Sequence, residues 1–285
     1  MQYIAPTTSA AAVAALAACN GDARLLAGGT DILVRLQADL VEPDLLVDIK
    51  HIVACQHITE DASGFIIGAA VPSAQLGEHA RLSQVWPGIV EGMGLVGSTQ
   101  VQGRATLTGN LCNASPAADG VPAMVAAGAT ACVVGPNGTR QLAVEDIPTG
   151  PGQISLANNE MIESFSLPPR PPRSSDAYIR FIPRTEMDIA VVGAAVNLTL
   201  DETGTCTAAC VVLGAVGPTF ITVNAAAEAL IGSQVDEAAL QAVQNACSTA
   251  ATPISDKRGT AEFRKHTAGV IARRAAIVAH SRALA

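Results

Sequence analysis

The feature that most constrains the fold is a polar interruption inside the apolar run of residues 105–129. A Gly109-Asn110 pair, a Ser-Pro pair and the lone acidic residue Asp119 break a stretch that otherwise consists mainly of small and apolar residues. Glycine and proline disfavour a continuous helix or strand, so the chain has to turn here within a largely buried environment. We therefore expect a binding segment at this place rather than a plain connection.

A second polar break, Ala27-Gly28-Gly29-Thr30-Asp31, separates the apolar pair Leu25-Leu26 from an apolar run that begins at Ile32. Glycine lets the backbone approach a phosphate without a Cβ in the way, and valine in place of Gly29 is expected to intrude on that path. Alone, this motif is better explained by a plain strand-to-helix turn. Two such motifs in one domain are harder to explain as turns. Residues 27–31 (first glycine segment) and residues 106–110 (second glycine segment) together predict a binding site for the diphosphate of a dinucleotide.

The side chains after the second glycine segment suit a polar ligand. Thr106, Asn110 and Ser115 offer hydrogen-bond donors to phosphate or sugar-alcohol oxygens. Ionised Asp119 can only accept, which suits a hydroxyl or a ring N–H. As an alternative, Asp119 caps the helix expected after Gly120, and the two functions are compatible.

A competing motif, Gly92-x-Gly94-x-x-Gly97, has the spacing of the dinucleotide-binding fingerprint. That fingerprint requires a preceding strand. Here Trp86-Pro87-Gly88 leads into a helical pattern at residues 89–93, so these glycines are expected to end a helix.

Composition excludes several classes of protein. The net charge of −8 argues against nucleic-acid binding. Seven cysteines without close pairs, and five histidines in no ligand spacing, predict no metal or iron–sulfur site. The charged fraction is only 15%, which fits either a surface covered by a partner or an alanine-rich monomer. No apolar run is long enough to span a bilayer and the N-terminus lacks the basic region of a secretory signal, so we expect a cytoplasmic protein.

The order of short helical and strand patterns predicts a mixed α+β fold. Residues 167–176 (LPPRPPRSSD) admit neither a helix nor a central strand, and 285 residues suffice for about two domains. We therefore expect domains at residues 1–172 and 173–285. Helices are expected at 10–18, 31–36, 74–80 (capped by Ser73), 121–127, 224–231, 237–250 and 261–279. Strands are expected before Gly28 and at 45–49, 65–69, 131–134, 140–144, 189–200 and 206–216. The Asn137-Gly138 pair predicts a hairpin turn between the strands at 131–134 and 140–144. In the last helix, an apolar stripe of Phe263, Val270 and Ile277, with Ile271 and Val278 beside them, is expected to pack on the domain.

Four stretches resemble the FAD-binding medium subunit of molybdenum hydroxylases, the family of aerobic carbon monoxide dehydrogenase and xanthine dehydrogenase. They run in the family's order and extend over nearly the whole chain: residues 25–32, 104–129, 182–190 (IPRTEMDIA) and 253–259 (PISDKRG). The resemblance implies an N-terminal FAD-binding region of two subdomains, similar to vanillyl-alcohol oxidases. A C-terminal antiparallel sheet with helices is implied to follow.

The same resemblance implies which residues bind FAD. Both glycine segments are implied to hold the pyrophosphate, and Ser115 and Asp119 to reach its ribityl and ring side. Ile162 and Arg180 match positions that contact the flavin. One residue departs from the family, because Thr108 stands where the first of two glycines is usual and so either obstructs the phosphate or adds a hydroxyl donor. The implied cofactor-binding residues are Ala27, Gly28, Gly29, Thr30, Asp31, Thr106, Thr108, Gly109, Asn110, Ser115, Asp119, Ile162 and Arg180.

By resemblance, the chain is an electron-transfer subunit of an oxidoreductase. A small [2Fe-2S] subunit is implied to deliver electrons to FAD on this chain, and a large molybdopterin subunit to oxidise the substrate, in a dimer of heterotrimers. FAD would then pass the electrons to an external acceptor. Two alternatives stay open: a flavin-free scaffold or binding protein of the same fold, and a free-standing flavin oxidoreductase.

Overall fold

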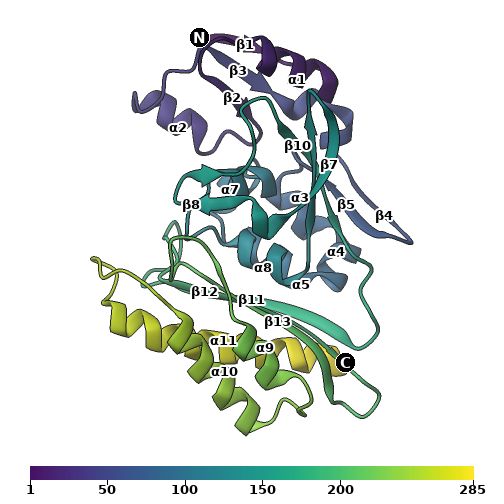
Figure 1. Ribbon diagram of the computed structural model, residues 1–285, viewed down its shortest axis with the longest axis vertical. Helices are drawn as coiled ribbons and strands as arrows, with labels where there is room; N and C mark the ends of the chain where they lie inside the picture. The colour runs from purple at the N-terminus through teal and green to yellow at the C-terminus, as the bar shows by residue number, and fades with distance from the viewer.

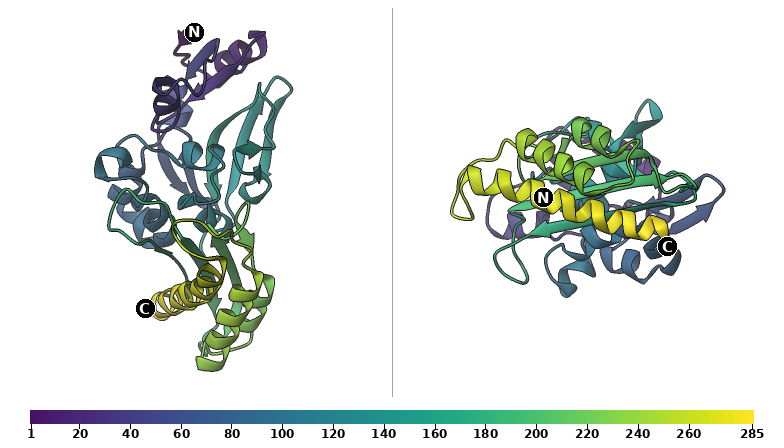
Figure 2. Two further views of the ribbon diagram at one scale, coloured as in Figure 1. Left: turned by 90° about the vertical axis from the view of Figure 1, so that its left-hand side faces the viewer. Right: turned by 90° about the horizontal axis from the view of Figure 1, so that it is seen from below.

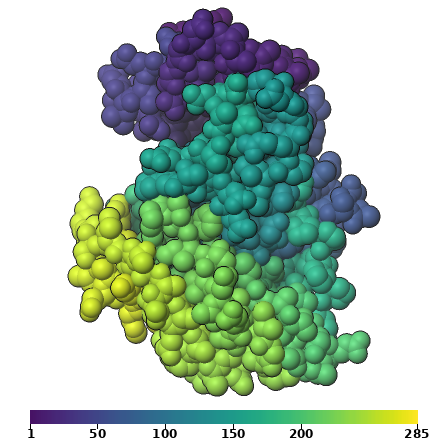
Figure 3. All heavy atoms as spheres, in the orientation of Figure 1, coloured from purple at the N-terminus to yellow at the C-terminus, as the bar shows by residue number.

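The computed structural model describes residues 1–285 and stacks three layers along its long axis (Figures 1 and 2). An N-terminal layer with a parallel sheet lies on a middle layer with an antiparallel sheet. A second antiparallel sheet with three helices forms the C-terminal layer. In the space-filling view, the N-terminal layer caps the middle one (Figure 3). The mixed α+β fold class predicted from the sequence is confirmed.

The N-terminal layer holds a three-stranded parallel sheet in the order β1-β3-β2. Helix α1 connects β1 to β2, and its start is fixed by Thr8, whose side chain accepts a hydrogen bond from the Ala11 N–H at 3.2 Å. Because the strands are parallel, β2 and β3 end at the same edge of the sheet, and the first glycine segment leaves from there. The elements are β1 (Gln2–Ile4), α1 (Ser9–Ala18), β2 (Ala23–Leu26), α2 (Ile32–Gln37) and β3 (Leu45–Asp48).

The middle layer is built on a five-stranded antiparallel sheet in the order β4-β5-β10-β6-β7. The predicted hairpin at Asn137-Gly138 is confirmed, with Gly135 paired to Gly138 and φ of +109° at Gly138. The central strand β10 had no recognised sequence signal. The strands are β4 (Ile58–Asp61), β5 (Gly64–Gly68), β6 (Thr130–Gly135), β7 (Gly138–Ala143) and β10 (Met161–Leu167), with a small hairpin of β8 (Pro148–Gly150) and β9 (Gln153–Ile154).

Short helices complete the middle layer and enclose its core. Helix α5 contains Gly92 and ends at Gly94, so the glycines of the competing fingerprint do end a helix, as the sequence predicts. Gly92 permits close helix packing, since a Cβ there would lie 2.7 Å from the carbonyl oxygen of Asp119. The helices are α3 (Ser73–Glu78), α4 (Ala80–Val85), α5 (Pro87–Gly94), α6 (Thr99–Gln102), α7 (Leu107–Cys112) and α8 (Gly120–Ala126), with 3₁₀ turns at Ile49–His51, Val53–Cys55 and Val144–Asp146.

The C-terminal layer is an antiparallel sheet, β11-β12-β13-β14, with helices α9, α10 and α11 on one face (Figure 2). Its other face packs on α5 and α8 of the middle layer. The buried apolar residues form two clusters. One extends through the N-terminal and middle layers, and the other lies between the C-terminal sheet and its three helices. The elements are β11 (Ser174–Phe181), β12 (Val192–Leu200), β13 (Cys206–Gly214), β14 (Ile221–Thr222), α9 (Asn224–Leu230), α10 (Glu237–Ala250) and α11 (Ala261–Leu284).

The stripe predicted to bury α11 is wrong for Phe263 and Ile277, which are 44% and 41% exposed, but Ile271 beside them is buried and Val278 packs against the C-terminal cluster. The rest of the buried face consists mainly of alanine together with Gly269. Small side chains let α11 lie close to the sheet. The helix also lies close to α10, since a Cβ at Gly269 would be 2.4 Å from the Gln244 carbonyl oxygen. Close approach, rather than large apolar side chains, therefore holds α11 in place.

The proline-rich segment is fixed by a buried ion pair between the middle and C-terminal layers. The Arg170 guanidinium lies 3.7 Å from the ring centre of Trp86 and 2.8 Å from the Asp176 carboxylate on β11. Arg282 of α11 donates a hydrogen bond of 2.9 Å to the Asp176 carbonyl oxygen. The two apolar clusters divide near this segment, and we retain the domain boundary after residue 172 as a proposal.

The Arg170–Asp176 ion pair predicts that the stability of the protein depends on pH. Burial raises the pKa of Asp176 from its ordinary value near 3.8 to about 6, an effect that the Arg170 charge only partly opposes. Because the pKa is higher in the folded state, the protonated Asp176 carboxyl contributes to the free energy of unfolding. This contribution is fully present below pH 3.8 and is lost as the pH rises through about 6. Between pH 4 and pH 7, we expect the wild type to lose on the order of 2–3 kcal/mol of unfolding free energy relative to Asp176→Asn, measured by urea unfolding. Parallel pH profiles for the two proteins would contradict this.

Candidate functional site

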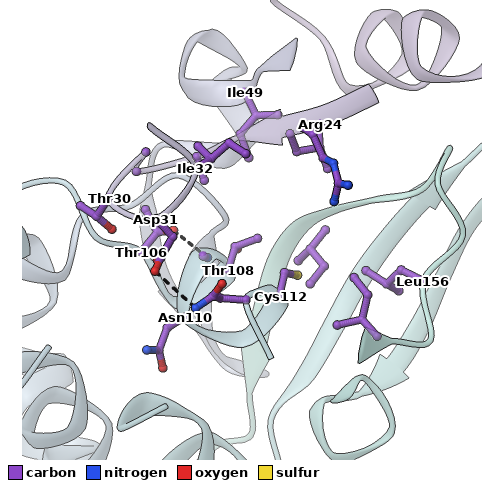
Figure 4. Close-up of a pocket in the computed structure, with 18 of the residues that line it drawn as sticks. Arg24, Thr30, Asp31, Ile32, Ile49, Thr106, Thr108, Asn110, Cys112 and Leu156 are labelled. Atoms are coloured by element: carbon purple, nitrogen blue, oxygen red, sulfur yellow. Dashed lines mark hydrogen bonds between the residues drawn. The ribbon is translucent and has the colours of Figure 1, made fainter. Parts of the chain in front are cut away.

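A cavity of about 410 Å³ lies between the N-terminal and middle layers, and both glycine segments line it (Figure 4). Thr30, Asp31, Thr106 and Asn110 gather on one side in this view, while Arg24 and Leu156 lie at the other. The predicted site residues that line the cavity are Ala27, Gly28, Gly29, Thr30, Asp31, Thr106, Thr108, Gly109, Asn110 and Ile162.

The first glycine segment begins where β2 ends, and a hydrogen bond from Lys50 fixes its first residue. The Lys50 ammonium donates to the Ala27 carbonyl oxygen at 3.2 Å and forms a 2.8 Å ion pair with buried Asp48. Gly29 adopts a φ of +85°, which strains any residue with a Cβ. A Cβ there would meet the side chains of Leu33 and Leu26 at 3.0 and 3.1 Å. The backbone conformation therefore requires glycine here, whereas the expected intrusion of a valine side chain on the phosphate path stays a prediction.

The second glycine segment forms the first turn of α7. Thr106 Oγ1 accepts from the Gly109 N–H at 3.0 Å, which caps the helix and leaves the hydroxyl proton free to be donated. The preceding Ala105 carbonyl oxygen accepts from the Ser73 N–H at 2.7 Å and from the Ser73 hydroxyl at 2.9 Å. Ser73 is thus the first residue of α3 rather than its cap, because its hydroxyl anchors the second segment instead.

The absence of a side chain at Gly28 brings the two segments together. A Cβ at this position would lie 2.0 Å from the Arg104 carbonyl oxygen and 3.1 Å from the Ala105 Cα. Arg104 and Ala105 directly precede the second glycine segment. The two segments, about eighty residues apart in the sequence, consequently form adjacent parts of one wall.

Backbone donors on this wall are unpaired within the chain. The N–H groups of Gly28, Gly29, Thr30 and Asp31 donate to no protein acceptor, and those of Leu107 and Thr108 do not either. Asn110 Oδ1 accepts from the Gly120 N–H at 3.0 Å, which leaves its amide protons available. Unpaired donors around a cavity favour a ligand rich in acceptor oxygens.

The rest of the cavity is largely apolar. Leu25, Ile49, Ile154, Leu156 and Ile162 line it, and they come from the N-terminal sheet and from the strands and loop around β9 and β10. A cavity with one donor-rich wall and one apolar region suits a ligand that carries both phosphates and a flat ring system.

Three predicted site residues do not line the cavity. Ser115 is exposed, and its hydroxyl accepts from the Ala117 N–H at 3.3 Å. The buried Asp119 carboxylate accepts from the Tyr178 hydroxyl at 2.7 Å and pairs with Arg180 at 2.6 Å. Burial raises the pKa of Asp119, and the Arg180 charge opposes that shift. The alternative role of Asp119 as a side-chain cap of α8 is not observed.

The cavity also has lining residues that we did not predict. Cys112 lies one helical turn beyond Thr108 in α7, and Asn113 donates to the Asp31 carboxylate at 3.3 Å. Helical spacing from Thr108 could have identified Cys112. The other unpredicted lining residues had no recognised signal: Arg24 in β2, just before the first glycine segment, and Leu156, Asn158 and Glu160 in the loop between β9 and β10.

Two further properties bear on the type of site. No group of three or more histidine, cysteine, aspartate or glutamate side chains is arranged to hold a metal ion, and all seven cysteines are free. Among the helices, none combines the length and the apolar character needed to cross a membrane.

Comparison with known proteins identifies the type of cavity. Residues 1–170 match the family described as the FAD binding domain in molybdopterin dehydrogenase. Residues 177–279 match the CO dehydrogenase flavoprotein C-terminal domain. The carbon monoxide dehydrogenase medium chain of Afipia carboxidovorans is 32% identical over 281 residues, which cover 99% of this chain and 97% of the relative.

Solved structures agree over the full length. Carbon monoxide dehydrogenase from Hydrogenophaga pseudoflava superposes with a TM-score of 0.94 at 29% identity, covering 99% of this chain and 98% of the other. Quinoline 2-oxidoreductase from Pseudomonas putida 86 gives a TM-score of 0.91 at 27% identity, with 100% and 98% covered. The fold and the cavity thus define a flavoprotein subunit of the molybdenum-containing oxidoreductases. The chain belongs to the family of FAD-binding subunits of molybdopterin dehydrogenases, which confirms the resemblance.

Gly28 provides a direct test of the shared wall. We expect Gly28→Ala to reduce the free energy of unfolding by about 1–3 kcal/mol, because the added methyl group forces the Arg104 carbonyl away. Gly77→Ala is the matched control, since Gly77 lies in α3 with nothing within 4 Å of an added Cβ. Urea unfolding measures both, and equal stabilities would show that the two segments are not in close contact.

Breaking the buried Asp119–Arg180 ion pair should lower the free energy of unfolding more than Gly28→Ala does. Asp119→Asn leaves the Arg180 guanidinium buried without a counter-charge, so we expect a destabilisation of about 3–5 kcal/mol. Tyr178→Phe removes a single hydrogen bond to the same carboxylate and should cost about 1 kcal/mol. Urea unfolding of the two variants checks the order, and a smaller loss in Asp119→Asn than in Tyr178→Phe would contradict a buried ion pair.

Proposed function

We propose that this chain holds FAD in the cavity between its N-terminal and middle layers and serves as the electron-transfer subunit of a molybdenum hydroxylase. The observation that carries the proposal is the wall on which two glycine segments present unpaired N–H groups side by side. FAD would place its diphosphate against this wall. The apolar region around Leu156 and Ile162 has the character needed for one of its ring systems.

Particular residues would hold the cofactor. The backbone of Gly28, Gly29 and Thr30 offers N–H donors, and the Thr106 hydroxyl and the Asn110 amide add side-chain donors on the opposite segment. The proposed contacts of Ser115, Asp119 and Arg180 with the ribityl and ring side remain predictions. In the structure, Asp119 and Arg180 are paired with each other.

The proposal includes a path for the electrons between subunits. FAD supplies the ability to take up electrons singly and to release them in pairs. We propose that a small [2Fe-2S] subunit delivers the electrons and that a large molybdopterin subunit carries out substrate oxidation. The Hydrogenophaga pseudoflava structure is of an enzyme form that lacks the Mo-pyranopterin moiety of the molybdenum cofactor, and the Afipia carboxidovorans relative is a medium chain, which supports this division among subunits. A dimer of heterotrimers and a cytoplasmic location stay predictions.

The experiment is a purification of the chain from its native host, followed by a visible spectrum and identification of copurifying chains. We expect flavin absorption in this chain, no iron–sulfur absorption once it is separated, and two copurifying subunits, one binding [2Fe-2S] and one binding molybdopterin. The apoprotein should also take up added FAD. A colourless chain that binds no added FAD would favour the flavin-free scaffold, and flavin without partner subunits would favour the free-standing oxidoreductase.

A further inference from the structure

Helix α11 carries an apolar stripe on a side that the rest of the chain leaves exposed. Phe263, Ile277 and Leu284 are 44%, 41% and 51% exposed, and the half-buried Val270 belongs to neither apolar cluster. The four residues recur every seven positions, so they follow one side of the helix along its length. Seen from below, α11 crosses the end of the molecule in front of the C-terminal sheet (Figure 2).

The stripe is not a core face that failed to pack, because the inner side of α11 is already filled. Ala268, Ala272 and Ala276 are fully buried against the C-terminal sheet and α10. A Cβ at Gly269 would lie 2.3 Å from the Ser248 hydroxyl oxygen of α10, so this side admits only small residues. Turning the helix to bury the stripe would force large side chains into that space. The stripe therefore stays on the surface of the isolated chain.

Polar side chains alternate with the apolar ones along the stripe. His266, Arg274 and Ser281 are exposed and stand three or four residues from their apolar neighbours. This alternation of three and four positions is the spacing with which two helices pack side by side. Such a seam is narrower than the apolar face with which an amphipathic helix lies in a membrane interface, so it fits one helix of another protein.

The unpaired charges beside the stripe are mainly basic. Residues 256–285 contain seven Lys and Arg but only two Asp and Glu, although the whole chain has a net charge of −8. Lys265 and Arg274 are exposed and form no ion pair within the chain, whereas four other arginines do: Arg258, Arg264, Arg273 and Arg282. Opposite charges across an interface favour the correct partner, so the surface complementary to α11 is acidic.

The same charges disfavour a second copy of this chain as the occupant. If two α11 helices packed in parallel along the stripe, each Arg274 would lie opposite the other. An antiparallel pair that matches Phe263 to Leu284 would place Arg274 opposite Arg273. Like charges brought together oppose both arrangements.

We propose that the stripe of Phe263, Val270, Ile277 and Leu284 is the docking surface for a helix of a partner subunit. That helix has apolar side chains that pack between these four and carboxylates that face Lys265 and Arg274. The inference rests on the proposed assembly with further subunits, and it adds the surface and the chemistry through which one of them binds.

The test adds a cysteine to the stripe, Ile277→Cys, and measures by mass spectrometry the rate at which N-ethylmaleimide labels it. The rate is compared between the isolated chain and the assembly purified from the native host. We expect labelling to be slower by about tenfold or more in the assembly, since a covered thiol reacts only when the interface opens. Ala62→Cys, in the exposed turn between β4 and β5, is the matched control and should react equally in both. Equal rates for Ile277→Cys would overturn the proposal.

The variant Arg274→Glu tests the charge of the partner. A carboxylate placed against an acidic surface should raise the dissociation constant of the separated partner subunits about tenfold at low salt, and by less at high salt. Arg81→Glu reverses an exposed charge on α4 in the middle layer and should leave that constant unchanged. A dissociation constant for Arg274→Glu equal to or below that of the wild type would refute an acidic partner.

The isolated chain distinguishes two other occupants. Size-exclusion chromatography should show a monomer, and a dimer that Ile277→Asp dissociates would assign the stripe to a second copy. Vesicles of phosphatidylcholine and phosphatidylserine should not bind the chain, and binding that Ile277→Asp abolishes would assign the stripe to a membrane. Either result overturns the proposal.

Failure of the proposed function gives a different result. If no subunits copurify with the chain, the proposed assembly is wrong and the docking surface with it. If they copurify while Ile277→Cys reacts as it does in the isolated chain, only the docking surface is wrong.

Discussion

The close backbone contact at Gly28 is the constraint on which the site depends. The first glycine segment follows a parallel strand of one sheet, and the second forms the N-cap and first turn of α7 in another layer. A hydrogen atom in place of a side chain at residue 28 lets them meet, since any Cβ would overlap the Arg104 carbonyl oxygen. Lys50 holds the first segment through a hydrogen bond to the Ala27 carbonyl oxygen, and Ser73 holds the start of the second through a hydrogen bond to the Ala105 carbonyl oxygen. The donor-rich wall is thus a product of tertiary packing, not of either motif alone.

The sequence predicted the parts of the fold whose signals are local. The hairpin at Asn137-Gly138, the helix at Glu237–Ala250 and the glycine segments each contain the residues that determine them. Strand β11 had no recognised signal, because Asp176 and Arg180 make it look solvent-exposed. Asp176 is buried against Arg170, which lies nearby in the proline-rich segment, whereas Arg180 is buried against Asp119 before α8, far away in the sequence.

Helix α11 illustrates a different limit. Its position was predicted, but only part of its buried face, since hydrophobic periodicity gives weight to large side chains and most of the buried residues are alanines at close approach. The candidate site shows the same division. Residues in the two glycine segments line the cavity, whereas Leu156 and Glu160 enter it from the loop between β9 and β10, which only the folded chain brings near.

The cavity is walled by two layers that each have their own sheet, and this arrangement gives the ligand a structural role as well as a redox one. A molecule that contacts residues 27–31 and residues 106–110 at once would act as a bridge across the seam between the layers. Loading and folding would then be thermodynamically coupled, because a ligand that binds only the native arrangement draws the folding equilibrium toward it. In a cell, the supply of the nucleotide would set how long a newly made chain persists.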